Sequence, residues 1–154
     1  MSRAAETSPE RVTVKAPREA VWSLLEDPEA LRRILPGCES LRTIGPGQYE
    51  AVLVTRVRFV RIRADVTATF LDAERPSHIR LVLHGRPRNF GGEFEASIPL
   101  DFEGTGETTE VSYHVDVTAS GAPAAFGLPV LRDALRSQVG GLVRNVEREL
   151  ASRG

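Results

Sequence analysis

The chain has 154 residues, of which 41% are apolar and 27% are charged, with a formal net charge of −1. A chain of this length forms one domain and buries roughly 70% of the surface that it exposes when unfolded, which allows a core and an internal cavity. The near balance of 20 basic and 21 acidic residues argues against general electrostatic binding of nucleic acid, and the single cysteine, Cys38, excludes an intramolecular disulfide framework or a cysteine-rich zinc site.

The sequence also indicates where the domain begins and where the protein works. No apolar run approaches the roughly 18 residues that a membrane-spanning helix needs. The first residues lack the apolar stretch of a secretory signal, so we expect a cytoplasmic protein. Residues 1–9 are small and polar, which predicts a disordered N-terminal segment followed by a single domain over residues 10–152.

The start of the domain predicts one strand and two short helices. Residues 11–15 alternate between polar and apolar side chains, the pattern of a strand. Pro17 can occupy the first turn of the helix that follows, because a missing N–H costs nothing there. Asp27 and Pro28 suit the N-cap and first position of a second helix, which Pro36-Gly37 ends.

The middle of the chain has a different character, with runs rich in Val, Ile, Thr, Phe and Tyr separated by turn sequences. Sequential strands joined by short turns form an antiparallel meander. Gly91-Gly92 predicts a bulge or a close backbone approach. We predict six strands, near residues 38–44, 48–57, 59–72, 78–86, 90–103 and 108–119.

The last segment predicts a long amphipathic helix over about residues 128–151, because apolar residues recur at intervals of three and four. Gly140-Gly141 interrupts this helix at a cost of about 1 kcal/mol each relative to alanine, which suits a kink or a close approach by another segment. The residues expected to face the sheet are Leu131, Leu135, Val139 and Leu142.

These elements predict an α+β fold. An open antiparallel sheet must cover its apolar face, and the long helix is the only sizeable cover that the sequence offers. We expect a curved sheet of about seven strands around the C-terminal helix, with the two short helices closing one end. A sheet wrapped around a helix in this way tends to leave space between them.

Three stretches resemble known families. Residues 14–22, VKAPREAVW, are similar to the opening of the START/SRPBCC superfamily, whose helix-grip fold encloses a hydrophobic cavity. Residues 27–41, DPEALRRILPGCESL, resemble a segment typical of the carbon monoxide dehydrogenase CoxG family. That family's last strand and helix entry are similar to residues 109–113, 117–121 and 126–127.

The resemblance covers roughly residues 10–150 and implies non-catalytic binding or carriage of a lipid- or quinone-like molecule, as an accessory to a molybdenum-containing dehydrogenase. No cofactor or metal ligand is expected. Tyr113 or Arg63 is a candidate to hold a polar head group. The second short helix, residues 28–35, is interpreted as a movable lid over the cavity mouth. The residues expected to bind the ligand are Trp22, Leu31, Leu35, Leu53, Phe90, Phe94, Tyr113, Phe126, Leu131, Leu135, Val139 and Leu142.

Two other classes of function stay open. The histidines, His78, His84 and His114, lie on separate predicted strands or turns, and the sequence has no hydrolase, phosphate-loop or dinucleotide-binding motif. A polyketide cyclase or aromatase would need His84 or His114 in the cavity beside another titratable group. A protein-interaction or assembly factor would instead be favoured by a collapsed cavity.

An arginine cluster, Arg56, Arg58, Arg61 and Arg63, spans two predicted strands and the turn between them, where the family often has glycine. One interpretation is a solvated hairpin whose charges discourage edge-to-edge aggregation. The other is a docking patch for a redox enzyme or for anionic lipid head groups, where each basic residue adds on the order of 1 kcal/mol. The second interpretation makes the protein peripheral to the membrane.

Overall fold

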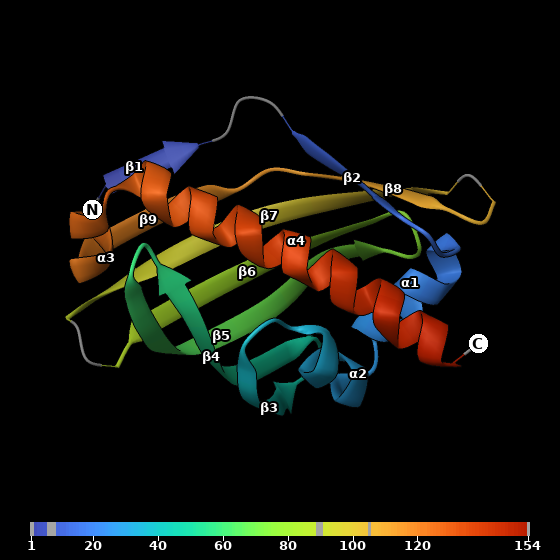
Figure 1. The fold of residues 1–154 in the computed structure, drawn as a ribbon, viewed down its shortest axis with the longest axis horizontal. Coiled ribbons are helices and arrows are strands. Elements are labelled where there is room, and N and C mark those ends of the chain that lie inside the picture. Colours follow the sequence, from blue (N-terminus) through green and yellow to red (C-terminus); the bar gives the residue numbers. More distant parts are fainter. Residues whose placement is uncertain (1, 6–8, 89–90, 105, 154) are drawn as a thin grey trace.

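The computed structural model describes residues 2–5, 9–88, 91–104 and 106–153. Over these residues a curved antiparallel sheet wraps around one long helix, as Figure 1 shows. The α+β prediction is confirmed. The strands are β1 (Ser2–Ala5), β2 (Glu10–Val14), β3 (Cys38–Gly45), β4 (Gln48–Val57), β5 (Val60–Glu74), β6 (His78–Pro87), β7 (Gly92–Gly104), β8 (Thr109–Tyr113) and β9 (Asp116–Gly121). The helices are α1 (Arg18–Leu25), α2 (Pro28–Ile34), α3 (Ala122–Phe126) and α4 (Leu128–Arg153).

The strands from β3 to β7 pair with their neighbours in chain order, as a meander requires. The strand predicted over 108–119 is divided, because β8 pairs with one part of β7 and β9 with another. The break lies opposite Ile98 and Pro99, between the paired residues Ser97 and Leu100. Proline has no N–H to donate to a ladder, which accounts for the interruption.

The prediction of a disordered segment over residues 1–9 is wrong for Ser2–Ala5, which form β1. This strand pairs antiparallel with β9, Ser2 opposite Ala119 and Ala5 opposite Asp116. The free edge of β9 offers unpaired N–H and C=O groups, and a neighbouring segment can pair with them whatever its side chains are. Composition therefore could not exclude this strand.

The helices begin and end close to the predicted positions. Pro17 is the N-cap of α1 rather than its first residue. Asp27 caps α2 as predicted, its Oδ1 accepting the Glu29 N–H at 3.0 Å, with Pro28 at the start of the helix. Both helices cover one end of the sheet, where Trp22 lies edge-on to Phe102 with ring centroids 5.6 Å apart. The closed end that the sequence predicts is therefore present.

Two glycine-rich sites confirm the predicted close approaches. Gly92 lies against the backbone of Ser120 and Gly121, so closely that no Cβ would fit. A Cβ on Gly141 of α4 would lie 3.0 Å from Cγ of Pro36, in the segment that follows α2. The absence of a side chain at Gly141 thus lets α4 pack directly on the exit of α2.

Gly37 is expected to be one of the least replaceable residues at this exit. Its φ is +69°, and a Cβ there would collide with the carbonyl oxygen of Val54, whose own N–H donates to the Gly37 carbonyl at 2.9 Å. We expect Gly37→Ala to lower the free energy of unfolding by about 3 kcal/mol, measured by urea denaturation. Gly106→Ala is the control, since φ is +82° there with nothing within 4 Å, and about 1 kcal/mol is expected. Equal losses would contradict the steric explanation.

Candidate functional site

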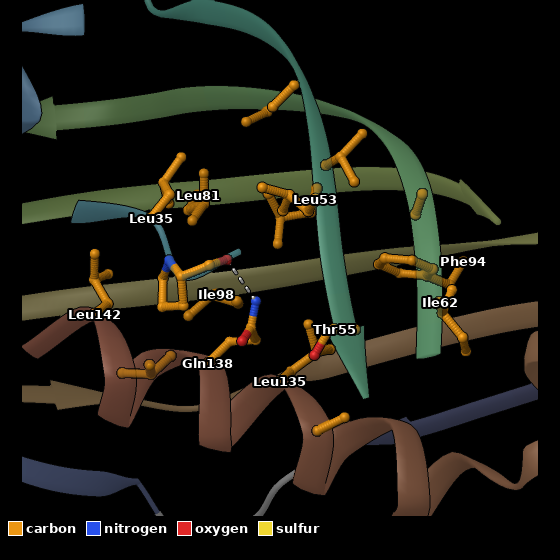
Figure 2. Close-up of a pocket in the computed structure, with 18 of the residues that line it drawn as sticks. Leu35, Leu53, Thr55, Ile62, Leu81, Phe94, Ile98, Leu135, Gln138 and Leu142 are labelled. Atoms are coloured by element: carbon orange, nitrogen blue, oxygen red, sulfur yellow. Dashed lines mark hydrogen bonds between the residues drawn. The ribbon is translucent and has the colours of Figure 1, made fainter. Parts of the chain in front are cut away.

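A cavity of about 170 Å³ lies between the inner face of the sheet, α2, α3 and α4. Figure 2 shows side chains from β4, β5, β6, β7 and α4 converging on it. The described residues that line it include no charged side chain. Most of them are Ala, Val, Leu, Ile, Pro or Phe, and the exceptions with polar groups are Tyr49, Thr55 and Gln138.

The space has a local cause in the β4–β5 pair. At three successive inward positions, one partner of each cross-strand pair is alanine: Tyr49 faces Ala68, Ala51 faces Val66, and Leu53 faces Ala64. An alanine leaves the volume of several methylene groups unfilled relative to leucine or phenylalanine. Near β7 and β9, by contrast, Leu135 and Val139 of α4 pack against a buried cluster that includes Ala96, Ile98 and Val117. The cavity therefore lies to one side of the helix, over β4 and β5.

The structure brings most of the predicted ligand-binding residues together. Those that line the cavity are Leu31, Leu35, Leu53, Phe94, Phe126, Leu131, Leu135, Val139 and Leu142. Phe90 lies outside the described residues. Tyr49, Thr55 and Gln138 were not predicted from the sequence, although the alternating pattern of β4 could have placed Tyr49 and Thr55 on the same face as Leu53.

Trp22 and Tyr113 are not on the lining, so their predicted place in the cavity is wrong. Trp22 is buried under α1 against Phe102. Tyr113 belongs to β8, beyond β7, and is buried with Ile98 and Val115. Both are large apolar residues on the inner face of the sheet, but that face is longer than the cavity. Burial, reinforced by Glu10, raises the pKa of the Tyr113 phenol.

Arg63 does not reach the cavity either, which removes it as a candidate to hold a head group. Its neighbours Ile62 and Ala64 line the cavity, so strand alternation turns Arg63 to the outer face. There it donates two hydrogen bonds to Glu39, at 2.9 and 2.7 Å. The guanidinium holds the pKa of the Glu39 carboxyl below its ordinary value.

The polar groups that do face the cavity are neutral. Gln138 donates from Nε2 to the Pro36 carbonyl at 3.3 Å, the dashed line in Figure 2, and Thr55 lies nearby on β4. Burial raises the pKa of the Tyr49 phenol, which keeps it protonated at neutral pH. The site thus offers hydroxyl and amide groups in an apolar wall, suited to binding rather than to proton transfer.

The interpretation of α2 as a lid stays a prediction, and the structure shows what such a movement must break. Leu31 and Leu35 cover the cavity. The Asn145 Nδ2 donates to the Ile34 carbonyl at 2.9 Å, and Arg33 forms a two-point ion pair with Glu149 at 3.1 and 3.0 Å. Opening would require these contacts between α2 and α4 to separate.

The histidines lie away from the cavity. Nε2 of His84 is 3.3 Å from the Glu93 carboxylate on the outer face of the sheet, and Nδ1 of His78 is 2.8 Å from Asp101. Neither His84 nor His114 is on the lining. A cyclase-like enzyme would need one of them in the cavity, and among the described residues this condition is not met.

A curved antiparallel sheet around a long C-terminal helix, with an apolar cavity between them, defines the START-type helix-grip class. Within this class, a model of the carbon monoxide dehydrogenase CoxG family matches residues 11–151, and the chain belongs to that family. Both statements agree with the resemblance found in the sequence.

Solved structures share the fold. A conserved protein from Geobacillus kaustophilus is 27% identical, with a TM-score of 0.82 over 92% of this chain and 93% of that one. The ZhuI aromatase/cyclase from Streptomyces sp. R1128 is 19% identical, with a TM-score of 0.69 over 99% and 96%. A START superfamily protein from Mycobacterium smegmatis is 13% identical, with a TM-score of 0.72 over 99% of both chains. Among curated protein sequences, none matches significantly.

The helices can also be compared with the requirements of a membrane span. Within the described ranges, no helix is both long and apolar enough to cross a membrane.

Proposed function

We propose that this CoxG-family protein binds and carries a hydrophobic or amphipathic small molecule in the cavity, without catalysing a reaction on it. The observation that carries the proposal is the lining, an uncharged apolar wall interrupted by Tyr49, Thr55 and Gln138. Burial of an apolar ligand is favourable by roughly 25 cal/mol per Å² removed from water, and a few polar groups suffice to orient it. A molecule with an apolar body and a small neutral head, lipid- or quinone-like, suits this wall.

Membership of the CoxG family supports a role beside a redox enzyme. We infer that the chain serves a molybdenum-containing dehydrogenase in the cytoplasm as an accessory carrier. The apolar body of the ligand would be shielded from water in the cavity, and Tyr49, Thr55 or Gln138 would bind its head.

The cavity favours carriage over the two alternatives. An aromatase/cyclase such as ZhuI shares the fold, but at 19% identity the likeness extends to the fold alone. The titratable group on the described lining is Tyr49, whose raised pKa makes it a poor base at neutral pH. An assembly factor would have no need of a cavity in its core.

The test is to identify what the purified protein contains. Native mass spectrometry of freshly prepared protein is expected to show an added mass that disappears on denaturation, and solvent extraction should yield an apolar compound. That compound should displace the fluorescent probe anilinonaphthalene sulfonate from the protein after its ligand has been removed. A protein without added mass that also fails to bind the probe would contradict the proposal.

A further inference from the structure

The β4–β5 hairpin ends in an exposed aromatic side chain. Its two-residue turn, Arg58-Phe59, lies between the paired residues Val57 and Val60. Phe59 is 97% exposed and Val60 is 36% exposed. Arg58 has a φ of +59°, a backbone conformation in which residues other than glycine are uncommon. The turn thus holds an apolar side chain in water at a strained position, where a glycine and a polar residue would cost less.

Positive charge surrounds this aromatic ring. Arg56 and Arg61 face each other across the two strands, an arrangement that like charges disfavour. Arg58 follows one strand directly, and all three side chains are exposed. Within the described part of the chain, no carboxylate forms an ion pair with them, whereas Arg63, two residues beyond Arg61, is paired with Glu39. We call residues 56–61 the docking tip.

The docking tip is continuous with one end of the cavity. Val57, within it, and Ile62, at its base, line the cavity together with Pro123 and Phe126 of α3. Figure 1 places the β4–β5 turn and α3 toward the same end of the molecule. Residues 121–131, GAPAAFGLPVL, carry no polar side chain. An apolar segment therefore accompanies the docking tip beside the cavity.

The shape of the docking tip favours a lipid surface over a protein partner. A stable protein interface buries roughly 800 Å² on each partner, and a two-residue turn with its flanking side chains cannot supply that area. A bilayer needs less, since an aromatic ring can enter the interfacial region while arginines extend to the head groups. The three exposed arginines select an anionic surface.

We propose that the docking tip binds anionic lipid bilayers, with Phe59 inserted among the head groups and Arg56, Arg58 and Arg61 contacting lipid phosphates. The ligand would then exchange between cavity and membrane at this end of the molecule. The exchange rests on the proposed function; the docking does not.

Vesicle flotation tests the docking. The protein is expected to float with vesicles of phosphatidylcholine and phosphatidylglycerol in equal parts, to float poorly with phosphatidylcholine alone, and to be released by salt. The triple substitution Arg56→Ser, Arg58→Ser and Arg61→Ser should lower the partition coefficient by about a hundredfold, since each basic residue is worth roughly fivefold at an anionic surface. Phe59→Ser should lower it about tenfold.

Two control variants match these changes elsewhere on the surface. The combination Arg11→Ser, Arg32→Ser and Arg148→Ser removes the same charge from positions outside the docking tip. Ile44→Ser removes a 43% exposed apolar side chain near the other end of β4. Both controls should float almost as well as the unaltered protein. Because the docking-tip side chains are exposed, their variants are expected to unfold at unchanged urea concentrations.

Three results would overturn the docking proposal: no flotation with either vesicle, equal losses in the docking-tip and control variants, or retention by an acidic protein partner in place of vesicles. Binding of anilinonaphthalene sulfonate without vesicles separates this proposal from the previous one. Docking-tip variants that keep probe binding but lose flotation support docking alone. A protein that floats but binds neither probe nor ligand would refute the carrier function and leave docking intact.

Discussion

Ala134→Phe is expected to weaken ligand binding by at least about tenfold while leaving the protein folded. Ala134 lies on α4 and lines the cavity, so a phenyl ring there occupies space that the ligand needs. Overpacking a filled core costs about 1–3 kcal/mol, but this ring enters a void and gains apolar contacts, so the free energy of unfolding should change by less than that. Titration with the extracted ligand or with anilinonaphthalene sulfonate measures the binding, and urea denaturation measures the stability.

The matched control is Ala151→Phe, the same substitution on the same helix at an exposed position. Binding should stay within about twofold of the unaltered protein, a difference of less than roughly 0.5 kcal/mol. If Ala134→Phe bound the ligand as tightly as Ala151→Phe does, the ligand would have to occupy another part of the protein, and the cavity would lose its assigned role.

Leu135→Asp is expected to lower the free energy of unfolding by about 3 kcal/mol or more, because it places a carboxylate without a charged partner in an apolar wall. Leu135 lines the cavity and packs on the cluster that contains Ile98 and Tyr113. Burial raises the pKa of the introduced carboxyl above its value in the unfolded chain. The destabilisation should therefore be largest at neutral pH and shrink as the pH falls below the unfolded-state pKa.

Urea denaturation at several pH values checks this expectation against Ser137→Asp, which introduces the same group on the exposed face of the same helix. Ser137→Asp should change stability by less than about 0.5 kcal/mol with little pH dependence. Equal effects of the two substitutions would mean that Leu135 does not face the sheet, and the helix-grip arrangement of α4 would be wrong.

Local sequence signals predicted the elements well where the cause of the structure is itself local. Asp27 and Pro28 satisfy the first turn of α2 within a few residues, and the apolar spacing along α4 selects one helix face. The interruption between β8 and β9 could have been predicted only by aligning Pro99 with the neighbouring strand, since the consequence of its missing N–H appears in β8 and β9 rather than in β7.

The cavity was harder to predict residue by residue. Periodicity assigns a side chain to the inner face of the sheet but does not distinguish a filled part of that face from an empty one. Trp22 and Tyr113 share the apolar pattern of Leu53 and Phe94, yet α1 and the buried cluster of β7–β9 enclose them. The alanines opposite Tyr49 and Leu53 create space only because β4 and β5 pair in this register.

The sequence by itself determined the α+β class, the two short helices, the meander and the long amphipathic helix, and its motifs indicated the CoxG family. Only the tertiary structure decided that β1 joins the edge of β9, that Arg63 turns outward to Glu39 while Arg56, Arg58 and Arg61 stay exposed around Phe59, and which apolar residues line the cavity. The physical reason is that hydrophobic periodicity records which face a residue occupies, whereas a cavity, an edge pairing or an ion pair depends on what another part of the chain places opposite that face.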